Sequence, residues 1–143
     1  MNPANRSEKL IQAGWERVEQ ALLRAGSEHH LIIHWFQTPE DSETHSDAHW
    51  HDDERTVKFV RVVIPTLAEQ LRATDLTVAV PWQVGAERAT LVLIAATAGQ
   101  TATLAARPLT RSALADAPPY WKLSSTAAEP PPILAELVAR LVI

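Results

Sequence analysis

The chain has 143 residues, of which 46% are hydrophobic, so it is the size of one domain and has enough apolar side chains for its own core. It contains no cysteine, which excludes disulfides, thiolate metal sites and a cysteine nucleophile. The formal net charge is −4 and the basic residues are scattered, which argues against direct binding to nucleic acid. We therefore expect a single domain over residues 1–143.

No membrane or targeting segment is visible in the sequence. No run approaches the roughly 18 apolar residues of a membrane span, and residues 1–9 are polar. These features predict a cytoplasmic protein that does not contact a membrane. Arginine outnumbers lysine ten to three, which is typical of a high-GC bacterial genome or of its phage.

An amphipathic helix is predicted near the N-terminus, over residues 7–25. Its apolar side chains recur every three or four residues and so share one face: Ile11, Trp15, Val18, Leu22 and Ala25. Gly26 follows, where a left-handed residue would end the helix. Residues 30–36 are apolar and aromatic, and they predict a short buried strand.

Residues 38–54 form an acidic, histidine-rich segment that we expect to be a loop. The segment holds seven acidic residues and no lysine or arginine, so the negative net charge of the protein comes from here. Because it has few apolar side chains, we expect no packed structure in it.

The next segment, residues 52–74, fits two interpretations. A helix is predicted by apolar residues that recur every three or four positions, namely Val57, Val60, Ile64, Leu67 and Leu71. Many of residues 57–64 are β-branched, and Pro65 disfavours a helical residue before it, so a strand over 56–64 with a short helix over 66–73 is the alternative. We prefer a helix bent near Pro65.

Three strands of an antiparallel meander are predicted next, over residues 76–82, 89–97 and 101–107. Gly99 and Gln100 predict a two-residue hairpin turn between the last two strands. Residues 109–114 fit a helical turn, and residues 120–123 fit a short edge strand.

A stiff proline spacer at residues 129–132 precedes a predicted helix over residues 133–143. An isolated helix of this length is marginal in water, so its apolar face must be buried, either within the subunit or in a homodimer. We expect Leu137 and Leu141 to make interaction contacts, and a homodimer through this helix is plausible.

Together these elements predict an α+β domain. Its core is a mainly antiparallel sheet of four to five strands, with the N-terminal, middle and C-terminal helices packed on one face.

All six histidines lie between residues 29 and 51, and His45, His49 and His51 stand close together. With Asp47 they have the side-chain chemistry that zinc or nickel prefers. Their spacing matches no established metal motif, so we expect no cofactor. A metal-binding protein or a metal-dependent hydrolase built on residues 45–53 is the alternative.

The sequence carries no catalytic or nucleotide-binding motif, because its four glycines are too far apart for a phosphate loop and no nucleophile elbow occurs. The leading hypothesis is a non-enzymatic accessory or adaptor protein that binds another protein. Trp50 would anchor the partner, and the surrounding acidic residues would contact it: Asp47, Asp52, Asp53 and Glu54. A further alternative is an acidic inhibitor that mimics nucleic acid.

Overall fold

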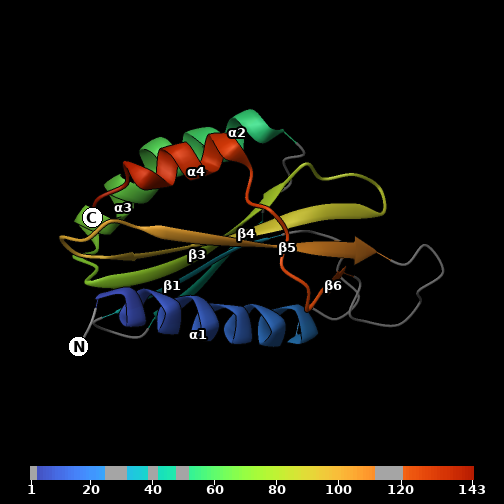
Figure 1. The fold of residues 1–143 in the computed structure, drawn as a ribbon, viewed down its shortest axis with the longest axis horizontal. Helices are drawn as coiled ribbons and strands as arrows, with labels where there is room; N and C mark the ends of the chain where they lie inside the picture. Colours follow the sequence, from blue (N-terminus) through green and yellow to red (C-terminus); the bar gives the residue numbers. More distant parts are fainter. Residues whose placement is uncertain (1–2, 25–31, 39–41, 48–51, 112–120) are drawn as a thin grey trace.

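The computed structural model describes residues 3–24, 32–38, 42–47, 52–111 and 121–143, with the side chains of residues 8–22, 52–111 and 121–143 (Figure 1). Its elements in chain order are α1 (Pro3–Arg24), β1 (Ile32–Thr38), β2 (Ser42–Asp47), α2 (Asp53–Lys58), η1 (Phe59–Val63), α3 (Ile64–Gln70), β3 (Asp75–Trp82), β4 (Arg88–Thr97), β5 (Thr103–Arg111), β6 (Trp121–Leu123) and α4 (Pro132–Ala139).

Within these described ranges, six strands form one antiparallel sheet in the order β2-β1-β3-β4-β5-β6. α1 covers one face of the sheet, while α2, η1, α3 and α4 cover the other (Figure 1). The predicted α+β class is confirmed, with its antiparallel sheet and its N-terminal, middle and C-terminal helices. The expectation that every helix lies on one face is wrong.

Two hydrophobic cores explain why both faces are covered. β3 and β4 are almost entirely buried, so their side chains need an apolar layer on each side of the sheet. The core under α1 includes Val18, Leu91, Leu93, Leu109 and Trp121. The core on the opposite face includes Val60, Ile64, Val78, Ile94, Leu134, Val138 and Leu141.

α1 lies unusually close to the sheet at Gly14. A Cβ atom built on this glycine would lie 2.8 Å from Leu93 Cδ2 and 3.3 Å from Thr77 Cγ2. Leu93 is fully buried, so it has little room to move away. A residue without a side chain is therefore what lets the helix pack at this distance.

The middle segment is helical throughout, which confirms the helical interpretation and excludes a strand over residues 56–64. Its central part, η1, is a π-helix in which the backbone N–H of Ile64 donates to the carbonyl of Phe59, five residues earlier. This wider turn lies directly before Pro65, whose ring would clash with the carbonyl four residues earlier in a regular α-helix. The π-turn therefore lets the helix continue past the proline.

The acidic segment is not a loop throughout, because residues 42–47 form β2. This strand pairs with β1 in antiparallel register, and α2 begins at Asp53. An edge strand tolerates charged residues since one of its sides has no neighbouring strand to pair with. The paired backbone of β2 thus overrides the polar composition that predicted a loop.

The hairpin between β4 and β5 is longer than predicted. The backbone N–H of Gln100 donates to the carbonyl of Thr97 at 3.0 Å, and Gly99 has a φ of 76°. This places Gly99 third in a four-residue turn, where a type II turn needs positive φ, and the strand restarts only at Thr103. β5 then runs to Arg111, so residues 109–111 are strand and not the start of a helical turn.

α4 is part of the subunit's own core. Leu134 and Val138 are fully buried, Leu141 is 5% exposed, and Leu137 packs against the same cluster. Leu141 and much of Leu137 are thus used within the subunit, and the expectation that these two residues contact a partner stays a prediction. No helix in the described ranges is long and apolar enough to span a membrane.

Candidate functional site

Three residues of the predicted site, Trp50, His49 and His51, lie outside the described residues. The backbone of His45 pairs in register with His34, and that of Asp47 pairs with Ile32 at the end of β2. In the part of the chain that is described, no group of three His, Asp or Glu side chains could hold a metal ion. The zinc or nickel hypothesis stays a prediction.

The acidic residues at the start of α2 have structural partners. Asp52 is the N-cap of α2, and its Oδ1 accepts a hydrogen bond from the backbone N–H of Glu54 at 2.9 Å. Asp53 Oδ1 accepts a bond from the backbone N–H of Gln83, also at 2.9 Å. Gln83 has a positive φ of 49°, so this bond helps to hold a strained turn after β3.

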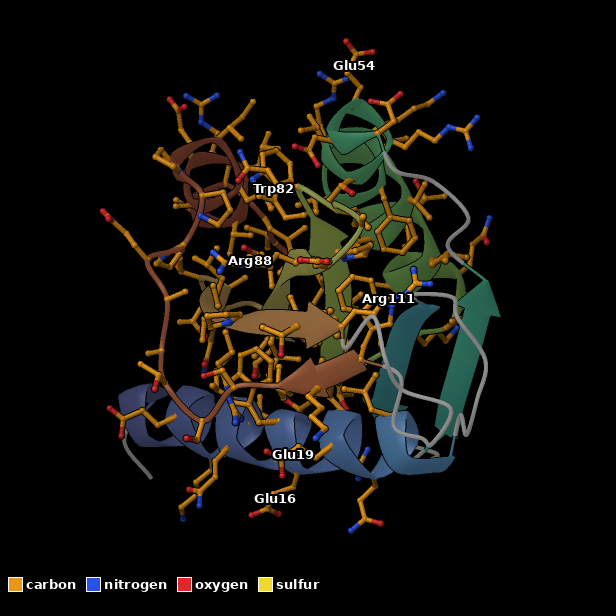
Figure 2. The ribbon with its side chains drawn as sticks, turned by 90° about the vertical axis from the view of Figure 1, so that its right-hand side faces the viewer. Glu16, Glu19, Glu54, Trp82, Arg88 and Arg111 are labelled. Carbon is orange, nitrogen blue, oxygen red and sulfur yellow. The ribbon has the colours of Figure 1, made fainter. Side chains whose placement is uncertain are left out.

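These carboxylates also line a hollow between α2 and the start of α4, with a volume of ≈ 550 Å³. Its three acidic residues are matched in number by Arg55, Lys58 and Arg61, so the charge of the lining does not favour a ligand of either sign. Trp82 and Ile133 supply its apolar surface (Figure 2 shows Trp82 and Glu54 at this end of the molecule). The structure brings Asp52, Asp53 and Glu54 together here, but the arrangement does not single out a partner.

A second groove, which the sequence did not indicate, lies between α1 and β5 on the other face of the sheet. Its volume is ≈ 980 Å³. We call it the α1–β5 groove, and its lining residues are Glu8, Ile11, Gln12, Trp15, Glu16, Glu19, Gly99, Gln100, Thr101, Thr103, Leu104, Ala105 and Arg107.

The α1–β5 groove has an apolar base and an acidic wall. Ile11 and Trp15 are partly buried against the core under α1, and they provide the apolar surface. Glu8, Gln12 and Glu16 are spaced four residues apart, so they form a polar line on α1 beside that surface. In Figure 2, Glu16 points from α1 into solvent, which places it at the outer rim.

One end of the groove is closed by Arg107, whose side chain is only 13% exposed. Its Nη2 atom lies 3.1 Å from Glu19 Oε1, and its Nε donates to the carbonyl of Ser124. The guanidinium also lies 5.0 Å from the centroid of the Trp15 ring, within range of a cation–π interaction. Arg107 therefore ties together α1, β5 and the chain after β6.

The backbone of β5 faces outward at Leu104, which lines this groove. The carbonyls of Ala106 and Pro108 accept bonds from Ala128 and Ser124, so these even-numbered residues point their backbone groups away from β4. Backbone direction alternates along a strand, so the N–H and C=O of Leu104 also point outward. They have no hydrogen-bond partner among the described residues.

A sequence signal for this groove existed but was weak. The Glu8, Gln12 and Glu16 spacing is visible in the sequence, but on its own it is typical of any solvated helix face. Locating the groove required knowing that β6 covers the edge of β5 over residues 109–111 and that the chain after β6 bonds to Pro108 and Ala106. These contacts are set by tertiary structure, which the local pattern does not contain.

Comparison of the chain with protein-family models, with curated proteins and with solved structures finds no match.

Proposed function

We propose that this chain is a non-enzymatic accessory protein that binds an extended segment of another protein in the α1–β5 groove. The observation that carries the proposal is the outward-facing backbone of Leu104, which lies beside an apolar groove and has no partner within the described part of the chain. A segment added there would pair with β5 and extend the sheet, a known mode of peptide recognition.

The fold itself contains a precedent for this arrangement. β6 pairs with the other half of the same edge of β5, and its Trp121 packs into the core under α1 at 4% exposure. The chain after β6 follows the same edge of β5, where the N–H of Ser124 donates to Pro108 and that of Ala128 donates to Ala106, so a bound segment would pair beyond Ala128, at Leu104. Its inward side chains would then rest on Ile11 and Trp15 as Trp121 rests on its own part of α1.

Backbone pairing and apolar contact would make different contributions to binding. Hydrogen bonds to the backbone of Leu104 do not depend on the sequence of the bound segment, whereas the side chains that enter the groove provide selectivity. Trp15 suits an anchoring contact because a large aromatic ring offers much contact area at little entropic cost. The Arg107 guanidinium lies 5.0 Å from the centroid of that ring and helps to hold it in place.

The test is a random peptide library displayed on phage and selected on the full-length protein. Enriched peptides are synthesised, and their dissociation constants are measured by fluorescence polarisation. Gln12→Trp fills the groove with a bulky ring, and we expect it to weaken binding by about ten-fold or more. Gln20→Trp is the matched control, since Gln20 is exposed on the same helix but does not line the groove.

Equal binding by both variants and the unaltered protein would exclude the α1–β5 groove as the binding site. Thermal unfolding of each variant shows whether the substitution has changed stability. Both positions are exposed on α1, so we expect both variants to fold.

A further inference from the structure

We infer that the segment bound in the α1–β5 groove is basic, with lysine or arginine side chains that meet Glu8 and Glu16. This inference rests on the proposed function and specifies the chemistry of the partner. It depends on which charges of α1 face the groove and on how far apart they lie.

On α1, described acidic side chains line the groove, whereas a described lysine lies outside it. The groove is lined by Glu8, Glu16 and Glu19, whereas Lys9 of the same helix is exposed and does not line it. Among the described residues of the lining, Arg107 is the one cation, and it is paired with Glu19. The carboxylates of Glu8 and Glu16 are therefore the two that can pair with a ligand, and the described lining has a net negative charge.

The spacing of these two carboxylates matches an extended chain. Residues eight apart on a helix are separated by about 12 Å along its axis, and residues four apart on a strand by about 13 Å. α1 and β5 run in the same direction in both views (Figures 1 and 2). An extended segment that lies in the groove along β5 therefore places side chains four residues apart next to Glu8 and Glu16.

The alternation of a strand adds a second condition on the bound segment. Side chains two residues apart point to the same side, so the residue midway between the two basic ones also faces α1. That position lies beside Gln12, with Ile11 and Trp15 beneath it. The geometry therefore favours a basic residue, an apolar residue two positions later, and a second basic residue two positions after that.

Other partners fit this groove less well. Nucleic acid and acidic peptides would bring further negative charge to Glu8 and Glu16, which repels them. A small polyamine matches the charge, but its protonated amines have no acceptor for the backbone N–H of Leu104. Spermidine therefore serves as the competitor that separates a bound cation from a bound peptide strand.

The experiment uses peptides enriched by selection on the full-length protein. Glu8→Gln with Glu16→Gln removes both free carboxylates, and we expect binding of the enriched peptides to weaken by about three- to thirty-fold, since each exposed ion pair contributes modestly. Glu69→Gln with Glu129→Gln is the matched control, because both residues are exposed and lie outside the groove. Binding by the control pair should be unchanged.

A charge exchange gives the sharper result. Peptides in which the two basic residues become glutamate should bind the Glu8→Lys, Glu16→Lys protein better than they bind the unaltered protein. Binding of the original peptides should also weaken as sodium chloride rises, because exposed charges are screened. Spermidine should compete only at concentrations that screen charge as simple salt does.

The outcomes separate this inference from the proposed function. If Gln12→Trp blocks the peptides but they are not basic, and the double glutamine variant binds them normally, the groove binds peptides and the inference is wrong. If Gln12→Trp has no effect, the proposed site is wrong and the inference fails with it. Specific displacement of the peptides by low spermidine would show that the groove selects a cation and not a strand.

Discussion

Two adjacent residues of α4, Ile133 and Leu134, differ in burial, so the effects of substituting them can be compared directly. Leu134 is fully buried in the core between the sheet and the middle helix, whereas Ile133 is 46% exposed at the start of the same helix. We therefore expect Leu134→Ala to destabilise the protein strongly and Ile133→Ala to have a small effect. The two substitutions remove similar numbers of carbon atoms from neighbouring positions.

The expected magnitudes follow from burial. Replacing a fully buried leucine with alanine costs about 2–5 kcal/mol, which includes the cavity left behind. We expect the cost of Ile133→Ala to stay below about 1 kcal/mol, because much of its side chain already contacts water. Removal of all residues after Pro132 would expose the apolar surfaces that Leu134, Val138 and Leu141 cover. Together these contribute about 5–9 kcal/mol, which is comparable to the whole stability of a domain.

Urea denaturation followed by tryptophan fluorescence measures both substitutions on full-length protein. The midpoint should fall sharply for Leu134→Ala, and the slope of the transition should stay the same. The truncated chain should be insoluble or unfolded. A truncated protein that is soluble and as stable as the full chain would refute the conclusion that α4 completes the core. So would equal midpoints for Leu134→Ala and Ile133→Ala.

Three further measurements test other parts of the structure. Gly99→Ala should destabilise the fold by about 1 kcal/mol, because alanine is strained at positive φ, whereas Gly85→Ala should cost less; equal thermal midpoints would contradict the assigned turn. Asp53→Ala should cost about 1 kcal/mol in urea denaturation through loss of the bond to Gln83, and Glu54→Ala, whose side chain is exposed, should cost less. Elemental analysis of untagged protein should find no stoichiometric zinc or nickel, and a bound metal that survives dialysis would support the alternative based on His45, His49 and His51.

The sequence predicts the elements of this fold better than their arrangement. The helical spacing of Val57, Val60 and Ile64 correctly identifies the middle helix, even though Pro65 and the β-branched residues point the other way. A local rule could not show that a π-turn would accommodate the proline. The spacing of apolar residues reports which side of a helix is buried, and this information is enough for α1, α3 and α4.

The arrangement of the layers depends on information that a local pattern does not contain. Residues 76–82 and 91–97 are mostly apolar, which indicates burial without telling whether one or both faces of the sheet carry helices. β2 was missed because its pairing with β1 stabilises a polar strand that has no apolar period of its own. The α1–β5 groove could not be predicted either, since it depends on how α1 packs beside β5 and the β4–β5 hairpin. A homodimer through α4 stays a prediction and would have to use the exposed Ile133 and Val142.

Gly14 lies on α1 together with the acidic wall of the groove, but it faces the sheet and not the groove. A methyl group at position 14 would push against Leu93, and either the leucine or the helix would have to give by a few tenths of an ångström or more. Because α1 is one wall of the groove, such a shift would change the groove's width without altering any of its lining residues. Substitutions at Gly14 would then tune the size of side chain that the protein accepts, and a change in ligand preference could arise from a position that no ligand touches.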